Sequence, residues 1–374
     1  MSERSEREPV SPGRARWLVP VAVVAALLAG ELGARWIGPD VPRTAGSEER
    51  VFIKTDQMYA RGTNSTDVLI LGSSETAGGL IPRVIETHAP QLDGVYNAAL
   101  AGTYQPIQEA WAARVALPAT DPNVVVIGML PMAVWRYPDM SRDPNAAADA
   151  AYRSAFDQVD PGRLGNFGWW LRSHSALIKY RPYLRKPLPV IQGLAIATGI
   201  KDQPAPVPPG AFGMDWKTET DPRVVKENTA ETGEVADYQS RSLDVTVDQK
   251  TGDIIARMPV GTVDFDDLDS LVATIRRHGA TPVVALAPMD RTVLRNSGVG
   301  LVPFDALVGK IEVWGRANHV PVNDAFTTDW NADDFHDRTH LDLAGSRRWS
   351  TQVGTWLADL CTAGRLPHAC EKTR

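Results

Sequence analysis

A serine, a histidine and an aspartate, which together can form a nucleophilic site, lie in two short motifs far apart in the sequence. Residues 72–74 (Gly-Ser-Ser) directly follow an apolar run, and residues 337–340 (Asp-Arg-Thr-His) lie near the C-terminus. A serine hydroxyl becomes a good nucleophile when a positioned imidazole accepts its proton, and a carboxylate fixes the tautomer of that imidazole. Ser74, His340 and Asp337 are therefore the candidate nucleophile, general base and orienting acid. The ordinary alternatives are a turn serine that caps a helix and a histidine in a surface loop.

Short apolar runs that alternate with helical patterns predict the elements that would position these residues. The run at 68–71 is bounded by polar residues and by glycine, and the run at 123–129 is the clearest strand of the sequence. The βαβ order predicts an α/β fold of three layers, α/β/α, around a mostly parallel, flavodoxin-like five-stranded sheet. Ser74 then lies at the carboxyl edge of the sheet, where such folds carry functional loops. The other expected strands are 95–97, 282–287 and 320–323, and the expected helices are 82–88, 105–117, 265–278 and 304–318.

The two motifs resemble the first and last sequence blocks of the SGNH (GDSL-type) hydrolase superfamily. Residues 71–75 (Leu-Gly-Ser-Ser-Glu) look most like the envelope-associated branch, which includes the D-alanyl transfer protein of teichoic acids and relatives that add or remove O-acyl groups on polysaccharides. Residues 336–345 are similar to the last block, and Asp342 is expected to cap the closing helix. The resemblance covers roughly residues 67–360 and implies an acyl-enzyme formed on Ser74.

The middle blocks of the superfamily match unevenly. Residues 97–102 resemble the second block, which implies that the backbone N–H groups of Gly102 and Ser74 hold the oxyanion. The third block normally reads Gly-x-Asn-Asp, but residues 128–131 read Gly-Met-Leu-Pro and supply no asparagine. Loss of one side-chain donor costs on the order of 10²–10³ in turnover. A backbone N–H near Met129 replaces that donor, or the activity is slow, or the substrate differs from that of simple esterases.

An apolar segment near the N-terminus predicts the cellular compartment. Residues 17–30 are all apolar or small and follow a cluster of arginines, and the segment extends to residue 37 with only Glu31 and Arg35 as charged interruptions. These two residues are four apart, so they can pair on a helix. We favour an uncleaved transmembrane anchor with the arginines in the cytoplasm and the remaining chain outside the cell membrane. A cleaved signal peptide and a buried helix of a soluble protein are the alternatives.

The predicted organisation has five parts. They are a cytoplasmic segment (1–16), a transmembrane anchor (17–37), a polar stalk (38–66), an SGNH-like domain (67–360) and a tail (361–374), with an insertion at about 137–253 inside the domain. The basic and aromatic part of the insertion either contacts anionic lipid or an envelope polymer, or simply packs on the main domain. In an exported protein Cys361 and Cys370 can form a disulfide, and two unpaired thiols are the alternative.

The charge and the cysteine content of the chain argue against nucleic-acid binding and against a cysteine metal site. The 374 residues carry a formal net charge of −6 with no basic cluster of the kind that binds nucleic acid, and the two cysteines have no neighbouring set suited to a metal. We expect a membrane-anchored, extracytoplasmic serine esterase or O-acyltransferase that acts on an acylated carbohydrate or envelope polymer, with no metal or organic cofactor. A membrane partner that delivers acyl groups would suit transfer. The alternative is a catalytically weak SGNH-like component that binds or scaffolds an envelope assembly, and a soluble cytoplasmic esterase is a third reading.

Overall fold

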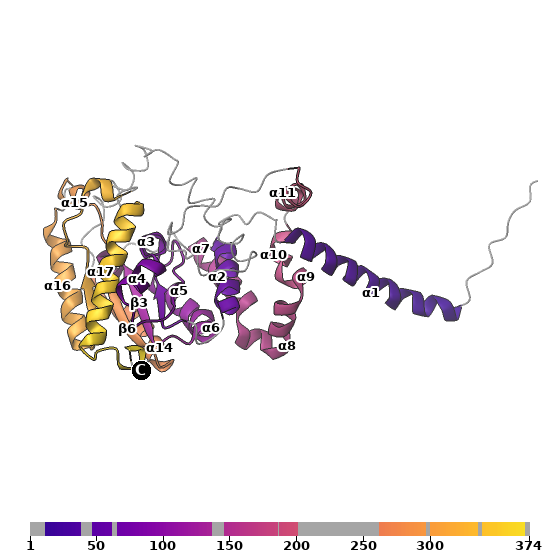
Figure 1. Cartoon of the computed structure of the whole chain (residues 1–374), viewed down its shortest axis with the longest axis horizontal. Helices are drawn as coiled ribbons and strands as arrows, with labels where there is room; N and C mark the ends of the chain where they lie inside the picture. The colour runs from indigo at the N-terminus through magenta and orange to yellow at the C-terminus, as the bar shows by residue number, and fades with distance from the viewer. Residues whose placement is uncertain are drawn as a thin grey trace, which may run out of the picture. The chain divides into compact units, whose positions relative to one another are not determined.

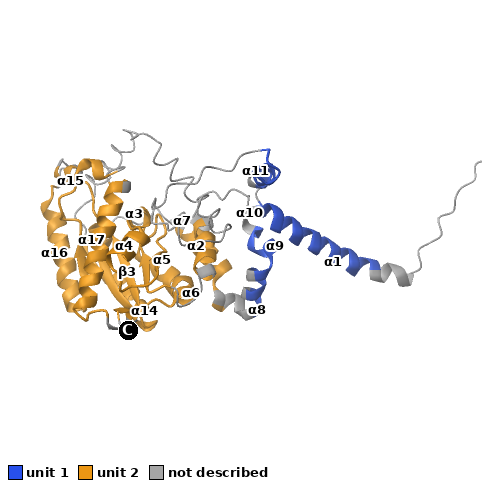
Figure 2. Ribbon diagram, in the orientation of Figure 1, with its two compact units in different colours: residues 1–43, 165–203 blue, residues 44–164, 204–374 orange. Residues whose placement is uncertain are grey.

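The chain folds as two units in a computed structural model that describes residues 12–38, 47–61, 66–136, 146–185, 187–200, 262–296, 300–335 and 339–370. Unit 1 comprises residues 1–43 and 165–203, and unit 2 comprises residues 44–164 and 204–374 (Figure 2). The predicted sheet lies in unit 2, whereas the apolar N-terminal helix lies in unit 1.

The sheet of unit 2 has five strands, and every pair of neighbouring strands is parallel. Figure 1 labels two neighbouring strands near its centre, β3 and β6. The order β2-β1-β3-β6-β7 corresponds to the flavodoxin-like order, so the predicted fold class is confirmed. All residues of β1, β2 and β3 are buried, which explains why these strands read as continuous apolar runs. The strands are β1 (Val68–Leu71), β2 (Val95–Asn97), β3 (Val124–Met129), β6 (Thr281–Leu286) and β7 (Val322–Asp324).

Helices cover both faces of this sheet. Alternate strand residues, such as Val68 and Ile70 in β1 and Val124 and Val126 in β3, share one core with α4 and α17. Right-handed crossovers put α5, α14 and α16 on the other face. The helices along the sheet segments of this unit are α3 (Ser74–Gly79), α4 (Pro82–His88), α5 (Gln105–Trp111), α6 (Leu117–Thr120), α14 (Asp266–Arg277), α15 (Arg291–Asn296), α16 (Val302–Ala317), α17 (Leu343–Thr362) and α18 (Pro367–Cys370). The unit also contains α2 (Ser47–Arg61) and α7 (Ala146–Val159). A π-helical stretch (Ala112–Ala116), 3₁₀ turns at Pro131–Val134 and Ala332–Asp334, and an antiparallel pair, β4 (Trp135–Arg136) with β5 (Thr262–Val263), complete it.

The predicted polar stalk is wrong for the part of it that the structure describes. Ser47–Arg61 forms helix α2, in which Val51, Phe52 and Met58 are buried against the rest of unit 2. The charged residues of this segment conceal the helical spacing of its apolar ones. Lys54 is also buried, and its Nζ donates to the backbone oxygen of Asn97 at 2.9 Å.

The predicted insertion is also not a single segment. Helix α7 (Ala146–Val159) packs with α2 and α5 inside unit 2, and its Tyr152, Phe156 and Val159 are buried. Residues 165–200 instead belong to unit 1, and the part of the insertion from 201 to 253 lies outside the described residues. The spacing of Tyr152, Phe156 and Val159, at i, i+4 and i+7, is a sequence signal that could have identified α7 as part of the domain.

Unit 1 is built on the long apolar helix α1 (Pro12–Ile37). Leu18–Ile37 has a mean hydropathy of 1.7 and is, by length and composition, long enough to span a membrane. The predicted pairing of its two charged residues is confirmed, because Arg35 Nε lies 2.8 Å from Glu31 Oε1. The rest of the described unit consists of the end of α8 (Pro161–His174), α9 (Ala176–Lys179), α10 (Arg181–Leu184) and α11 (Pro187–Ala197).

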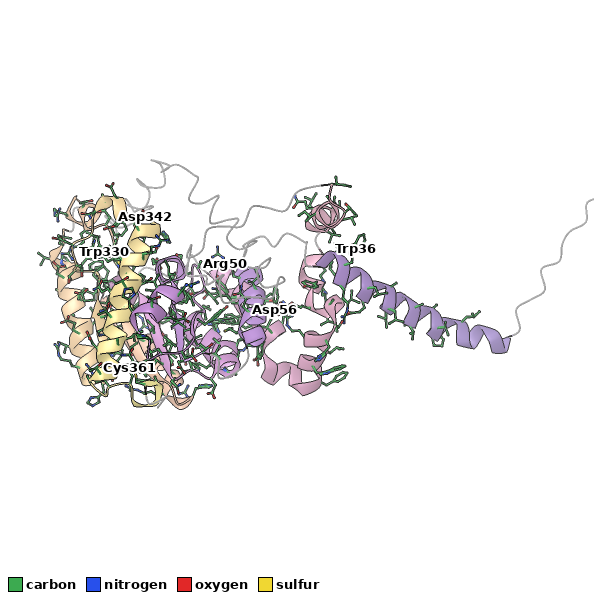
Figure 3. The ribbon with its side chains drawn as sticks, in the orientation of Figure 1. Trp36, Arg50, Asp56, Trp330, Asp342 and Cys361 are labelled. Atoms are coloured by element: carbon green, nitrogen blue, oxygen red, sulfur yellow. A yellow bond between two sulfur atoms is a disulfide. The ribbon has the colours of Figure 1, made fainter. Side chains whose placement is uncertain are left out.

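The two cysteines form the disulfide that the sequence allowed. Cys361, near the end of α17, is bonded to Cys370 of α18 with the Cα atoms 5.6 Å apart, and Figure 3 labels Cys361 at the opposite end of α17 from Asp342. A crosslink of this separation stabilises a fold by about 2–3 kcal/mol in the chain-entropy model. It fastens the short last helix to the helix that closes the sheet.

Tyr59 of α2 gives the protein a pH dependence in the alkaline range. Burial, and then the negative charge of Asp160, raises the pKa of Tyr59 from 10.0 to about 12. The unfolded chain therefore loses this proton at lower pH than the folded chain, so the stabilisation is complete below pH 10 and is lost as the pH rises through 12. Because Tyr59 is partly exposed, we expect the free energy of unfolding to fall by about 1–2 kcal/mol across this window. Urea unfolding at a series of pH values should show this decrease, and Tyr59→Phe should show a smaller one; equal decreases would contradict the prediction.

Candidate functional site

Ser74 begins helix α3, three residues after the end of β1. It is half-buried, and the preceding residue, Ser73, occupies the N-cap position without using its side chain as a cap. Ser74 lies one residue past the N-cap position, so its hydroxyl does not cap α3, which was the ordinary alternative for this residue. Ser74 lies at the carboxyl edge of the sheet, as the strand pattern predicted.

A close contact between three residues fixes the turn that leads into α3. A Cβ atom on Gly72 would lie 2.4 Å from Thr76 Oγ1 and 2.6 Å from the carbonyl oxygen of Gly128. A Cβ atom on Gly128 would likewise lie 2.3 Å from Thr76 Oγ1. Thr76 itself is fully buried. Glycine is thus required at both positions because the first turn of α3 packs directly on the end of β3.

Asn97, the last residue of β2, holds α3 from the other side. Its side chain is buried, and Nδ2 donates to the carbonyl oxygens of Thr76 at 3.0 Å and Leu80 at 2.9 Å. Its Oδ1 accepts from the backbone N–H of Ala99 at 3.0 Å. The Thr76 carbonyl also accepts from the Leu80 N–H at 3.1 Å, so the Asn97 amide adds a second donor there and supplies one to the Leu80 carbonyl at the C-cap. It thereby ties the end of α3 to the loop that follows β2.

The loop that contains Gly102 is bonded to the serine turn. The carbonyl oxygen of Gly72 accepts from the Leu100 N–H at 2.9 Å and from the Thr103 hydroxyl at 3.2 Å. Gly102 lies between these two donors, is exposed, and has a φ of +73°, a value that favours glycine. The structure therefore brings the loop of Gly102 to the turn of Ser74.

The loop that contains His340 reaches α3 through helix α17. Ser346 Oγ donates to the carbonyl oxygen of Gly78 at 3.0 Å, and Ser350 Oγ accepts from the Ile81 N–H at 2.8 Å. Leu341, next to His340, is buried, and its Cδ1 lies 3.7 Å from where a Cβ on Gly79 would be. The segments of Ser74 and His340, more than 250 residues apart in sequence, are thus packed together in one unit.

The structure describes His340 and the residues that follow it, but not the three residues 336–338 before Thr339. Its ring is half-buried, and Nδ1 lies 3.1 Å from Thr339 Oγ1. Asp342 accepts from the Gly345 N–H at 2.7 Å, which confirms that it caps α17; Figure 3 labels it at the start of this helix. Asp337 lies outside the described residues, together with His336 and Arg338. The role of Asp337 therefore stays a prediction.

Two further carboxylates follow strands of the sheet, and both serve in turns. Asp290 Oδ1 accepts from the N–H of Thr292 at 2.9 Å, and Asp324 Oδ1 accepts from the N–H of Thr327 at 3.0 Å. In the third block, Gly128 and Met129 are the last residues of β3, and a 3₁₀ turn begins at Pro131. Within the described part of the chain, no group of three or more His, Cys, Asp and Glu residues is arranged to hold a metal.

The structure adds supporting residues that sequence reasoning missed. Tyr152 of α7 donates to the carbonyl oxygen of Ala101 at 2.5 Å, beside Gly102, and Tyr104 donates to Asp149 of the same helix. Lys54 of α2 binds the carbonyl oxygen of Asn97. The two contacts of α7 had a sequence signal, the helical spacing of its apolar residues, whereas the charged residues of α2 conceal the burial of Lys54.

No family model matches this sequence, and no curated protein matches it.

Proposed function

We propose that this chain is a membrane-anchored serine esterase or O-acyltransferase of the SGNH type. The observation that carries the proposal is the direct attachment of three segments to one another at the carboxyl edge of the sheet. The turn of Ser74 is bonded through Gly72 to the loop of Gly102, and α3 is bonded to α17, which follows His340. The sequence blocks that resemble the superfamily are the ones that these contacts join.

The chemistry follows from the proposed roles. Ser74 Oγ attacks the acyl carbonyl while His340 accepts the hydroxyl proton, and the N–H groups of Ser74 and Gly102 stabilise the oxyanion. His340 then gives the proton to the departing alcohol oxygen, which leaves the acyl group as an ester on Ser74. Water or a sugar hydroxyl attacks that ester, again with His340 as base, and Ser74 regains its proton. Asp337 would orient the imidazole throughout.

Three features support a location outside the cell membrane. The α1 helix has the length and composition of a membrane span, and an arginine cluster precedes it. The third feature is the disulfide between Cys361 and Cys370, because disulfides form and persist in oxidising compartments. An acylated carbohydrate or envelope polymer is the substrate class that suits this location. Acyl transfer would additionally need a membrane partner that supplies activated acyl groups.

A fluorophosphonate probe tests the nucleophile in the full-length protein. We expect wild-type protein and Ser73→Ala to be labelled and Ser74→Ala to remain unlabelled, because the probe phosphonylates only an activated serine, with loss of fluoride. Peptide mapping of the labelled protein identifies the modified residue. An unlabelled wild-type protein would favour the binding or scaffolding role instead, and equal labelling of Ser74→Ala would show that Ser74 is not the nucleophile. Protease access to a C-terminal tag in spheroplasts tests the location separately, and full protection of the tag would contradict an extracytoplasmic domain.

A further inference from the structure

Two helices of unit 1 expose large apolar side chains. On α8, Phe167 is 73% exposed and Trp170 is 52% exposed, and on α11, Leu188 and Ile191 are 71% and 62% exposed. Leu188, Ile191 and Leu194 recur every three residues and so form one stripe along α11. Exposed apolar residues that are grouped in this way indicate a surface that binds something apolar.

These helices are attached to the outer end of the candidate membrane span. Glu31 of α1 accepts from the N–H groups of Ala176 and Leu177, at 2.9 and 3.1 Å, and from Ser175 Oγ at 2.7 Å. Arg35 donates to the carbonyl oxygen of His174 at 2.9 Å. The two charged residues that interrupt the apolar run are therefore the residues that hold the start of α9 and the end of α8.

Close packing fixes the height of this attachment along α1. The Leu177 side chain lies 3.5 Å from where a Cβ on Gly30 would be, and the ring of Tyr180 occupies the place of a Cβ on Gly38. At a rise of about 1.5 Å per residue, Glu31 lies roughly 9 Å before Ile37, the end of the span. The junction thus falls within the outer part of the span, and Figure 2 shows the described parts of α8–α11 gathered at this end of α1 in blue.

The remaining side chains of the segment suit the boundary between lipid and water. Phe167, Trp170 and His174 stack in succession along α8, with ring centroids 6.1 and 4.8 Å apart. Aromatic side chains concentrate at membrane interfaces, and cationic ones favour anionic headgroups. Arg181 and Arg185, both exposed, follow within the same segment.

We propose that α8–α11 form an interfacial element that inserts the exposed apolar side chains of α8 and α11 into the outer leaflet beside α1. The occupant of this surface is lipid acyl chain. The inference rests on the part of the proposed function in which α1 crosses the membrane. It adds that the protein is held to the bilayer at a second place, so that unit 1 lies against the membrane surface instead of standing away from it.

Site-specific fluorescence in liposomes tests this element in the full chain. Both native cysteines are in the disulfide, so Phe167→Cys or Ile191→Cys can be labelled with an environment-sensitive fluorophore and reconstituted in equal parts of phosphatidylcholine and phosphatidylglycerol. We expect several-fold stronger quenching by lipids with a spin label near the top of the acyl chain, and several-fold weaker quenching by iodide, than at Val302→Cys. Val302 is a matched control because it is an apolar residue of unit 2 that is 79% exposed.

A label in α1 separates the two hypotheses. Lipid quenching at Val23→Cys, an exposed position of the span, together with iodide quenching at Ile191 equal to that at Val302, would overturn the interfacial element and leave the anchor intact. Shielding of Ile191 from both quenchers would also overturn it, because a protein partner or a second copy would then cover the surface. Absence of lipid quenching at Val23 would contradict the anchor itself.

Discussion

Replacement of His340 by glutamine is expected to slow the hydrolysis of p-nitrophenyl acetate by about 10³-fold or more, because in the proposed mechanism His340 is the base that activates Ser74. The reaction of Ser74 with fluorophosphonate should slow in parallel. Glutamine keeps the polarity and approximate size of the side chain, and His340 is only half-buried, so the fold should persist. Stopped-flow and steady-state rates, read beside the thermal unfolding temperature, measure both effects.

His278 provides a matched control for this substitution. It lies at the end of α14, where its Nδ1 is 2.9 Å from the carbonyl oxygen of Thr274, and it belongs to the amino edge of the sheet. His278→Gln should leave turnover unchanged. If His340→Gln kept more than a tenth of the wild-type rate while folding normally, His340 would not be the base.

The strands of the sheet could be predicted because their sequence signal is local. Parallel strands buried on both faces are uninterrupted apolar runs, and Val68–Leu71 and Val124–Met129 are of this kind. Helix α2 was missed for the opposite reason: Lys54 and its charged neighbours make the segment look solvated, whereas Lys54 is buried against the Asn97 carbonyl. A tertiary contact of this type decides burial and leaves no trace in local composition.

In the candidate site, too, features that depend on neighbouring residues could be predicted, and contacts between distant elements could not. The position of Ser74 after a strand and the capping role of Asp342 follow from neighbouring residues, so both could be predicted. The contact of Thr76 with Gly128 and the support that Tyr152 gives to Ala101 join elements from different parts of the chain. Such contacts depend on how elements pack, which no single segment encodes.

Asn97 is the residue on which the placement of Ser74 depends most. Asn97→Ala removes the Nδ2 donor from the Leu80 carbonyl at the C-cap of α3, the second donor to the Thr76 carbonyl, and the acceptor of the Ala99 N–H, all in a buried site. We expect a loss of about 3 kcal/mol in the free energy of unfolding. Because α3 is short and carries Ser74, we also expect fluorophosphonate labelling to slow by about 10-fold or more. Chemical denaturation and labelling rates, both at a temperature where the variant is fully folded, measure the two effects.

Asn123 separates stability from positioning. Its Nδ2 donates to Asp67 Oδ1 at 2.9 Å just before β3, at the amino edge of the same sheet. Asn123→Ala should therefore lower stability by about 1–2 kcal/mol and leave the labelling rate unchanged. Equal labelling rates for both folded variants would mean that Ser74 keeps its position without the amide of Asn97. A slower rate for Asn97→Ala alone would tie the reactivity of the serine to the hydrogen bonds at the far end of its helix, because those bonds connect α3 to the loop of Gly102.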